Sequence, residues 1–131
     1  MLVMISMSHN HRALVVDDDA VTRILLCRML HNLGWGSDEA GDVPEALQRL
    51  TENNYGVVIA DFNLPSGTGL DILAAVQAKA VSTPTVLITS YIEYSTLPEE
   101  STLRLGGQLT KPVSSQMLAD VLERLSQGAG K

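Results

Sequence analysis

The sequence predicts an α/β domain, a five-stranded parallel sheet with helices on both faces. Five short candidate strands, three of them apolar runs, alternate along the chain with longer stretches in which apolar residues recur at helical spacing. The three apolar runs lack the polar alternation of a half-exposed strand, and such continuous runs are typical of strands buried by helices on both sides. The length of 131 residues suits one domain with one core.

The predicted strands are short, and each is followed by a helical stretch. The clearest strand is "RALVV", which is rich in β-branched residues and runs into acidic residues. The weakest is "WGSDEA", which is mostly polar. We expect the five strands at residues 12–16, 35–40, 55–60, 85–89 and 107–110.

The first two predicted helices have recognisable ends. Apolar residues at helical spacing predict a helix over 20–33, and Gly34 is a natural C-terminal stop. The second helix runs from Asp42 to about residue 53. Asp42 and Glu45 resemble a capping box, and Leu47 is expected to face inward.

The remaining helices follow the third, fourth and fifth strands. Leu70, Leu73 and Val76 mark the third helix. Pro98 and two glutamates open a short fourth helix, for which Leu103 is expected to face inward. The last helix is expected to be capped by Ser114 or Ser115 and to bury Leu118, Val121, Leu122 and Leu125.

Composition excludes several classes of function. The net charge of −6 argues against a binder of nucleic-acid phosphates, which is usually basic. No apolar run approaches the length of about 20 residues that a membrane span needs. The single cysteine, Cys27, suggests a reducing compartment, so we expect a cytoplasmic location. Residues 11–127 are expected to fold, with flexible tails at 1–10 and 128–131.

Several strands end in a residue that can take part in chemistry. The first runs into Asp17 and Asp18, the third into Asp61, the fourth ends at Thr89, and the fifth is followed by Lys111. In a parallel sheet the carboxyl ends of the strands lie at one edge, where functional groups gather. We therefore expect these side chains to lie close together.

Clustered carboxylates predict a site for magnesium and a phosphoryl group. Acids packed together repel one another, and hard oxygen ligands favour Mg²⁺, which binds one or two carboxylates beside a phosphate. Asp61 is the best candidate nucleophile, since a carboxylate can form an acyl phosphate. Lys111 can supply a cation and Thr89 a hydroxyl for the phosphoryl oxygens.

With these residues placed, the chain resembles the receiver domain of bacterial two-component response regulators, of which the stand-alone chemotaxis regulator is the simplest example. The resemblance covers residues 12 to about 127. "LVVDDD" is similar to the family's first strand and acidic pair, and "ADFNLPSGTG" to its phosphoacceptor loop. "VLITS" and "LTKP" match the switch hydroxyl and the lysine.

The resemblance implies a fold and a set of roles. The fold would be flavodoxin-like and doubly wound, with strand order 2-1-3-4-5. Asp61 would accept a phosphoryl group from a sensor histidine kinase or a histidine phosphotransfer protein. Asp18 and Asp61 would hold Mg²⁺ through their carboxylates, Asp17 mainly through water, and Asn63 through its backbone carbonyl.

The resemblance also implies how the domain would switch. Lys111 would pair with the phosphoryl oxygens, Thr89 would swing toward them, and the Lys111–Pro112 bond would be cis. Phosphotransfer and dephosphorylation would be self-catalysed, as in a phosphoacceptor rather than a classical enzyme. Residues 98–127 would contact a downstream protein, with no direct contact to nucleic acid or membrane, and dimerisation is left open.

The sequence departs from the family pattern near its fifth strand. Three residues before the lysine the family usually has Tyr or Phe, and here Gln108 stands there. Gly106 replaces a more usual polar residue, and "RL" at 104–105 stands where Gly-Ala is common. These departures leave phosphorylation intact as an expectation, but they put aromatic-coupled signalling in doubt.

Two other functions remain as alternatives. The first is a receiver-like scaffold that binds a partner without switching. The second is a phosphatase like the haloacid dehalogenases, because "VVDDDAV" fits their acid-x-acid-x-Val start with Asp17 as nucleophile and Asp19 as acid/base. That class needs a further acidic pair after Lys111, where only Asp120 and Glu123 remain, inside a predicted helix.

Overall fold

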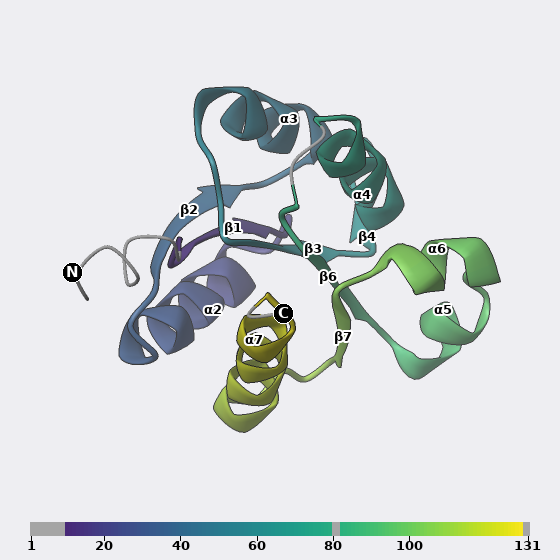
Figure 1. The fold of residues 1–131 in the computed structure, drawn as a ribbon. Coiled ribbons are helices and arrows are strands. Elements are labelled where there is room, and N and C mark those ends of the chain that lie inside the picture. The colour runs from purple at the N-terminus through teal and green to yellow at the C-terminus, as the bar shows by residue number, and fades with distance from the viewer. Residues whose placement is uncertain (1–9, 80–81, 130–131) are drawn as a thin grey trace.

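Five parallel strands form the central sheet of the computed structural model, which describes residues 10–79 and 82–129 (Figure 1). Its strand order, β2-β1-β3-β6-β7, is the predicted 2-1-3-4-5 once the two strands of a small hairpin are set aside. The strands are β1 (Arg12–Val16), β2 (Gly36–Ala40), β3 (Val57–Asp61), β6 (Thr85–Thr89) and β7 (Gly107–Thr110).

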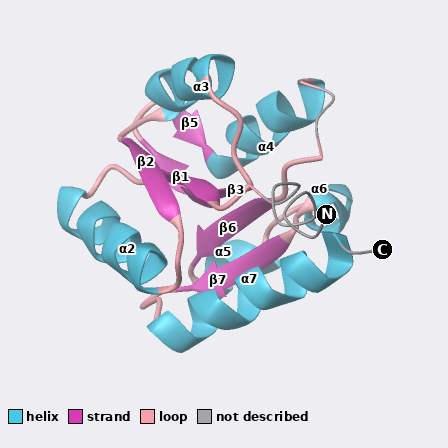
Figure 2. Cartoon of the chain, turned by 60° about the vertical axis from the view of Figure 1, so that its left-hand side comes forward, coloured by secondary structure: helices cyan, strands magenta, loops and turns pink. Residues whose placement is uncertain are grey.

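Helices cover both faces of this sheet, as predicted. Helices α2 and α7 lie on one face and α3 and α4 on the other, whereas α5 and α6 lie at the end of the sheet beside β6 and β7 (Figures 1 and 2). The helices are α2 (Ala20–Asn32), α3 (Val43–Glu52), α4 (Gly69–Ala78), α5 (Tyr91–Ser95), α6 (Glu99–Arg104) and α7 (Ser115–Ala129). No helix of the described residues combines the length and apolar character needed to cross a membrane.

The core forms two layers because successive side chains of a strand point to opposite faces. Ala13 and Val15 belong to the layer under α2 and α7, while Leu14 and Val16 belong to the layer under α3 and α4. All five residues of β3 and of β6 are buried. The continuous apolar runs in the sequence reflect this burial on both faces.

The structure corrects the predicted burial of some helix residues and the predicted bounds of the third strand. Leu103 is 80% exposed and Leu47 is 37% exposed, so neither faces the core as expected. On α2 only Leu26 and Leu30 are buried, although the helix carries many more apolar residues. The third strand begins at Val57 rather than residue 55 and extends through Asp61.

Two elements between the predicted ones were not anticipated. A hairpin of β4 (Asn63–Leu64) and β5 (Gly67–Thr68) follows β3, and the helix α5 precedes the expected fourth helix. Both are too short to show a periodic apolar pattern. The hairpin follows the carboxyl end of β3, and α5 follows the carboxyl end of β6.

The helix caps follow the sequence pattern with one difference. Asp42 caps α3 by accepting a hydrogen bond from Glu45 N at 2.9 Å. The Glu45 carboxylate accepts instead from Gly41 N, at 2.7 Å, so the reciprocal bond of a capping box is displaced by one residue. Ser114 caps α7 by accepting from Met117 N at 3.1 Å.

Part of the predicted tails lies outside the described residues. Residues 1–9 belong to the predicted N-terminal tail and are outside the described ranges, as are residues 130–131 of the predicted C-terminal tail. Asn10 is described and bonds Asn54 O through its amide at 2.9 Å. Helix α7 runs to Ala129.

Candidate functional site

The candidate site lies at the carboxyl edge of the sheet, where four strands end side by side. In the sheet register Val16 pairs with Ala60, Asp61 pairs with Ile88, and Thr89 pairs with Thr110. This register places the residues that end or follow each strand next to one another. The sequence-based expectation that they share one edge is met by the geometry.

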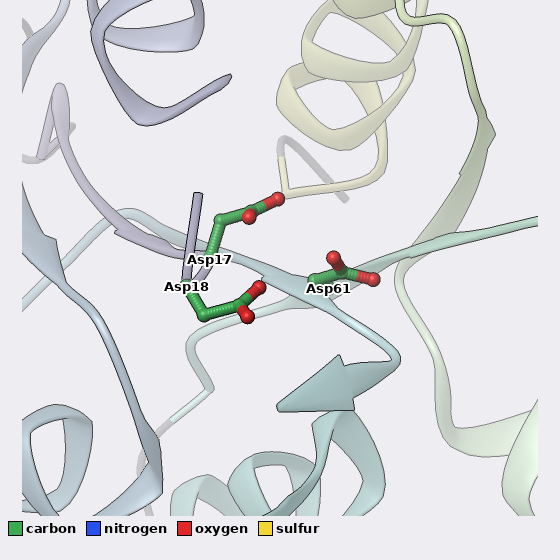
Figure 3. Close-up of side chains that lie close together, drawn as sticks. All are labelled: Asp17, Asp18 and Asp61. Carbon is green, nitrogen blue, oxygen red and sulfur yellow. The ribbon is translucent and has the colours of Figure 1, made fainter. Parts of the chain in front are cut away.

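Three carboxylates form the centre of the site. One oxygen from each of Asp17, Asp18 and Asp61 lies within 4.8 Å of the others, and the three side chains lie close together at the end of β3 and in the segment after β1 (Figure 3). Asp17 is 1% exposed and Asp61 is 4% exposed, whereas Asp18 is exposed. Two buried acids therefore lie beside a third that faces solvent.

The Asp17 carboxylate is only partly satisfied by the protein. Its Oδ1 accepts a hydrogen bond from Asp19 N at 2.8 Å, but its buried Oδ2 has no hydrogen-bond partner. Burial raises the pKa of Asp17, and the nearby charge of Asp61 adds to the rise, although the bond from Asp19 opposes it. A buried carboxylate oxygen without a partner is costly unless a cation or proton accompanies it.

This donor set fits a hard divalent cation. Three carboxylates supply the oxygen ligands that Mg²⁺ prefers, and the partnerless oxygen of Asp17 lies among them. The cation would offset the repulsion between the acids. The exposed position of Asp18 leaves one side of the cluster open to solvent, where waters or a phosphate can complete the coordination.

Lys111 brings a positive charge to Asp61. Its Nζ donates a hydrogen bond to Asp61 Oδ2 at 2.7 Å, with the lysine side chain 48% exposed and the aspartate side chain 6% exposed. Burial alone lowers the pKa of Lys111, but the hydrogen bond and charge of Asp61, with the charges of Asp17 and Glu93, raise it overall. The ammonium group is therefore held charged. The Lys111–Pro112 bond is cis, as the resemblance implied.

Thr89 is the buried hydroxyl at the end of β6. It is 0% exposed, and its Oγ1 accepts a hydrogen bond from Gln108 Nε2 at 2.9 Å. The same nitrogen of Gln108 donates to Thr110 Oγ1, also at 2.9 Å. The residue that departs from the family pattern is thus in direct contact with the predicted switch hydroxyl.

Gly69 allows the loop between β3 and α4 to close tightly under Asp61. A Cβ atom at this position would lie 2.3 Å from Leu87 Cδ1 and 2.9 Å from the Asp61 carbonyl oxygen. Gly69 N donates to Phe62 O at 3.0 Å, which fixes the start of α4 against the end of β3. Any larger residue would displace the backbone that carries Asp61.

Glu93 is a residue of the site that the sequence reasoning missed. Its carboxylate accepts from Ser90 N at 2.8 Å and also bonds the side-chain amide of Asn63. Glu93 thereby links the loop after β3 to the start of α5. The signal was present, because Ser90 and Glu93 have the spacing of a capping box directly after a strand end.

The phosphatase alternative finds little support in the position of Asp19. This residue caps α2, accepting from Thr22 N at 3.3 Å and from Thr22 Oγ1 at 2.5 Å. Its carboxylate is thus engaged with the helix and not directed into the cluster of acids. To act as a general acid/base, Asp19 would have to break its capping hydrogen bonds with Thr22.

Comparison with known proteins identifies the family. The sequence model of the response regulator receiver domain matches residues 13–123, which is most of the chain. The chain belongs to the response regulator receiver domain family. It is therefore a receiver domain of two-component signalling.

The receiver domain has similar relatives among chemotaxis proteins. It is 29% identical to the chemotaxis protein CheY of Pseudomonas aeruginosa over 117 residues, which cover 87% of this chain and 94% of the relative. It is 26% identical over 122 residues to CheY-3 of Vibrio cholerae, covering 91% and 94% of the two chains.

Solved receiver structures share the fold. The response regulator TrrA of Thermotoga maritima, in complex with Mg²⁺-BeF, is 29% identical with a TM-score of 0.78, covering 87% of this chain and 97% of the other. A receiver domain from Clostridium thermocellum has a TM-score of 0.80 at 23% identity, covering 90% and 96% of the chains.

Proposed function

We propose that this receiver domain accepts a phosphoryl group on Asp61 from a phosphohistidine donor with Mg²⁺ and switches conformation to regulate a partner protein. The observation that carries the proposal is the environment of Asp61. Its buried carboxylate lies in a cluster of three acids and receives a hydrogen bond from Lys111. The Mg²⁺-BeF complex of the relative TrrA supports the same use of this kind of site.

The proposed reaction needs positioning and charge neutralisation more than acid–base chemistry. A carboxylate oxygen of Asp61 attacks the phosphorus of the phosphohistidine. The P–N bond breaks, its electron pair returns to the imidazole nitrogen, and an acyl phosphate forms on Asp61. Lys111 holds a positive charge beside the oxygens that become more negative, and Thr89 offers a hydroxyl proton to one of them.

The carboxylates of Asp17, Asp18 and Asp61 and the backbone carbonyl of Asn63 would hold the magnesium ion. When bound, Mg²⁺ supplies positive charge to the attacking carboxylate and to the phosphoryl oxygens. The chain's own contribution is to keep Asp17 and Asp61 buried and close together. Their repulsion in the absence of a cation favours its binding.

Switching would follow from the new charge. An acyl phosphate brings roughly −1.5 to −2 charge and new acceptor oxygens into a site that held a single carboxylate. Thr89 and Lys111 gain contacts only in that state, so phosphorylation favours the conformation in which those contacts form. We propose that residues 98–127 present the change to a downstream protein.

The phosphohistidine donor would dock on the apolar face of α2. Val21, Ile24 and Leu25 are 63%, 51% and 48% exposed, and Leu25 borders a largely apolar cavity of about 470 Å³ that reaches Lys111. A donor protein must bring its histidine to the mouth of the site, so its contact surface must adjoin that mouth. An exposed apolar face at this place suits an apolar helix of a histidine kinase or phosphotransfer protein. Phosphotransfer from such a donor would take place in the cytoplasm, so we propose a cytoplasmic location.

The test is labelling with acetyl phosphate in the presence of Mg²⁺, followed by peptide mapping. We expect one label, on Asp61, and none in Asp61→Asn. Asp120→Asn, on the exposed side of α7, is the matched control and should label normally. Label on Asp17 would instead support the phosphatase alternative. Equal affinity for the downstream partner with and without beryllofluoride would support the scaffold alternative.

A further inference from the structure

Gln108 connects the buried Thr89 hydroxyl to its neighbours on β7. Gln108 pairs with Leu87, and Thr110 pairs with Thr89, so positions 108 and 110 point to the same face of the strand beside Thr89. Gln108 Nε2 lies 2.9 Å from both Thr89 Oγ1 and Thr110 Oγ1. The side-chain amide thus bridges two hydroxyls on adjacent strands.

The direction of these hydrogen bonds decides what Gln108 does to Thr89. An amide nitrogen has two protons and only donates, so Thr89 Oγ1 is the acceptor. A hydroxyl that accepts in this way keeps its own proton for another partner, and the bond it receives polarises its O–H group. Gln108 therefore leaves Thr89 prepared to donate.

We propose that Gln108 is a positioning residue that holds the Thr89 hydroxyl with its proton available to the phosphoryl group on Asp61. This inference rests on the proposed function of Asp61. The family usually has an aromatic side chain at this position, which turns inward with the switch hydroxyl. Here a direct hydrogen bond from Gln108 to Thr89 takes the place of that rotation. Gln108 does not touch the phosphoryl group and acts only through Thr89.

The Gln108 side chain also connects Thr89 to a cavity between α5, α6 and α7. Gln108 lines a mainly polar cavity of about 330 Å³ together with Tyr94 of α5, Thr102 of α6 and Arg124 of α7. If Thr89 moves toward the phosphoryl group, its hydrogen bond draws the Gln108 amide with it. The cavity, which lies within the surface proposed to meet a downstream protein, then changes in shape and polarity.

The test is a double-mutant cycle on beryllofluoride affinity, measured by calorimetry with Mg²⁺ in the full chain. Gln108→Met keeps the length of the side chain but removes the donor, and we expect about 3- to 10-fold weaker binding. Thr89→Val should weaken binding by a similar or larger factor. Adding Gln108→Met to Thr89→Val should change the affinity by less than about 2-fold, because the hydroxyl is already absent.

Controls separate positioning from a structural role. Gln127→Met, at the exposed far end of α7, should bind as the wild type does. If Gln108→Met does not fold, Gln108→Leu takes its place in the cycle. The side-chain amide of Gln108 gives an NMR signal that can be assigned by its loss in Gln108→Met. In the unphosphorylated protein this signal should shift when Thr89 is replaced by Val.

Three results would overturn the inference. Tighter beryllofluoride binding in Gln108→Met would mean that Gln108 competes with the phosphoryl group for Thr89. Additive losses in the double variant would mean that Gln108 acts elsewhere. A wild type that binds no beryllofluoride would remove the proposed function itself, and with it this inference, so the two failures are distinguishable.

Discussion

Lys111 donates a hydrogen bond to Asp61 with its Nζ 2.7 Å from Oδ2, although 50 residues separate the two in the sequence. This contact joins the end of β3 to the residue that follows β7, an edge strand of the sheet. In the proposed reaction, this contact would place the ammonium group beside the oxygens that become more negative during phosphoryl transfer.

Lys111→Met tests the role of this charge. We expect the rate of Asp61 phosphorylation by acetyl phosphate to fall by about 100-fold, because one preorganised cationic donor is lost. The carboxylates remain, so Mg²⁺ should still bind. Lys79→Met is the control, since Lys79 lies at the end of α4 and bonds Leu50 O. An unchanged rate would show that Lys111 serves only to pair with Asp61 in the resting state.

Asp17→Asn is expected to stabilise the protein in the absence of metal. The raised pKa of Asp17 means that the fold favours its protonated form, so stability falls as the pH rises through that folded-state pKa. The cost of ionising the buried carboxylate is therefore greater at high pH than at low pH. The neutral amide should raise the free energy of unfolding by about 1 kcal/mol in urea titrations without Mg²⁺.

The same variant should lose its response to Mg²⁺. Magnesium binding to the folded state should stabilise the wild type, and the gain should grow with Mg²⁺ concentration. Asp17→Asn should gain much less, since one carboxylate of the cluster is gone. Equal stabilisation of both proteins would contradict a cation site at Asp17.

Glu93→Gln tests whether a negative charge at the mouth of the site slows an anionic donor. Gln keeps an acceptor for the Asn63 amide but removes the charge that acts on Lys111. We expect acetyl phosphate to label Asp61 about 2- to 5-fold faster at low salt, with a smaller difference at high salt. Glu100→Gln, on the exposed face of α6, should leave the rate unchanged. A slower rate in Glu93→Gln would indicate that Glu93 helps to order the site.

Ile24→Gln tests the proposed donor surface on α2. The side chain is 51% exposed, so the substitution should cost little stability. Transfer from a phosphorylated histidine phosphotransfer protein should slow by about 5-fold or more, whereas labelling by acetyl phosphate should not change. Leu103→Gln, on α6, is the control for loss of an exposed apolar residue. Equal slowing with both donors would place the effect within the site and not at its docking surface.

Tyr55 gives the fold a dependence on alkaline pH. Burial, together with the hydrogen bond to Asp38 at 2.7 Å, raises the pKa of Tyr55 to about 12. The folded state therefore holds the phenolic proton more tightly than the unfolded chain, whose tyrosine pKa is about 10. This stabilisation is complete below pH 10 and is lost as the pH rises toward 12.

Tyr55→Phe should remove that dependence. The variant should be about 1–2 kcal/mol less stable than the wild type at pH 7, because Asp38 loses one hydrogen bond, and the difference should shrink between pH 10 and 12. Urea titrations across this pH range measure both effects. Tyr91→Phe, whose side chain is exposed, should follow the wild type. A constant difference across the range would show that the phenolic proton is not coupled to folding.

The sequence predicted the long elements well and the short ones poorly. The strands at 12–16 and 85–89 were placed correctly because their apolar runs end abruptly. The strand at 107–110 was also placed correctly, although Leu109 is its only apolar residue. The hairpin β4–β5 and the helix α5 were missed, since a few residues cannot show a period. Leu47 and Leu103 fit an apolar pattern yet face solvent, because apolar residues on a helix do not by themselves reveal where the neighbouring elements lie.

By itself the sequence determined the fold class, the order of the strands through its family resemblance, and the edge at which Asp17, Asp61 and Lys111 would lie. Parallel strands joined by helices leave little choice about which strand ends share an edge. Only the tertiary structure decided that Gln108 bonds Thr89 and that Glu93 reaches Asn63. Such contacts depend on register and side-chain direction between segments distant in the chain, which no local pattern contains.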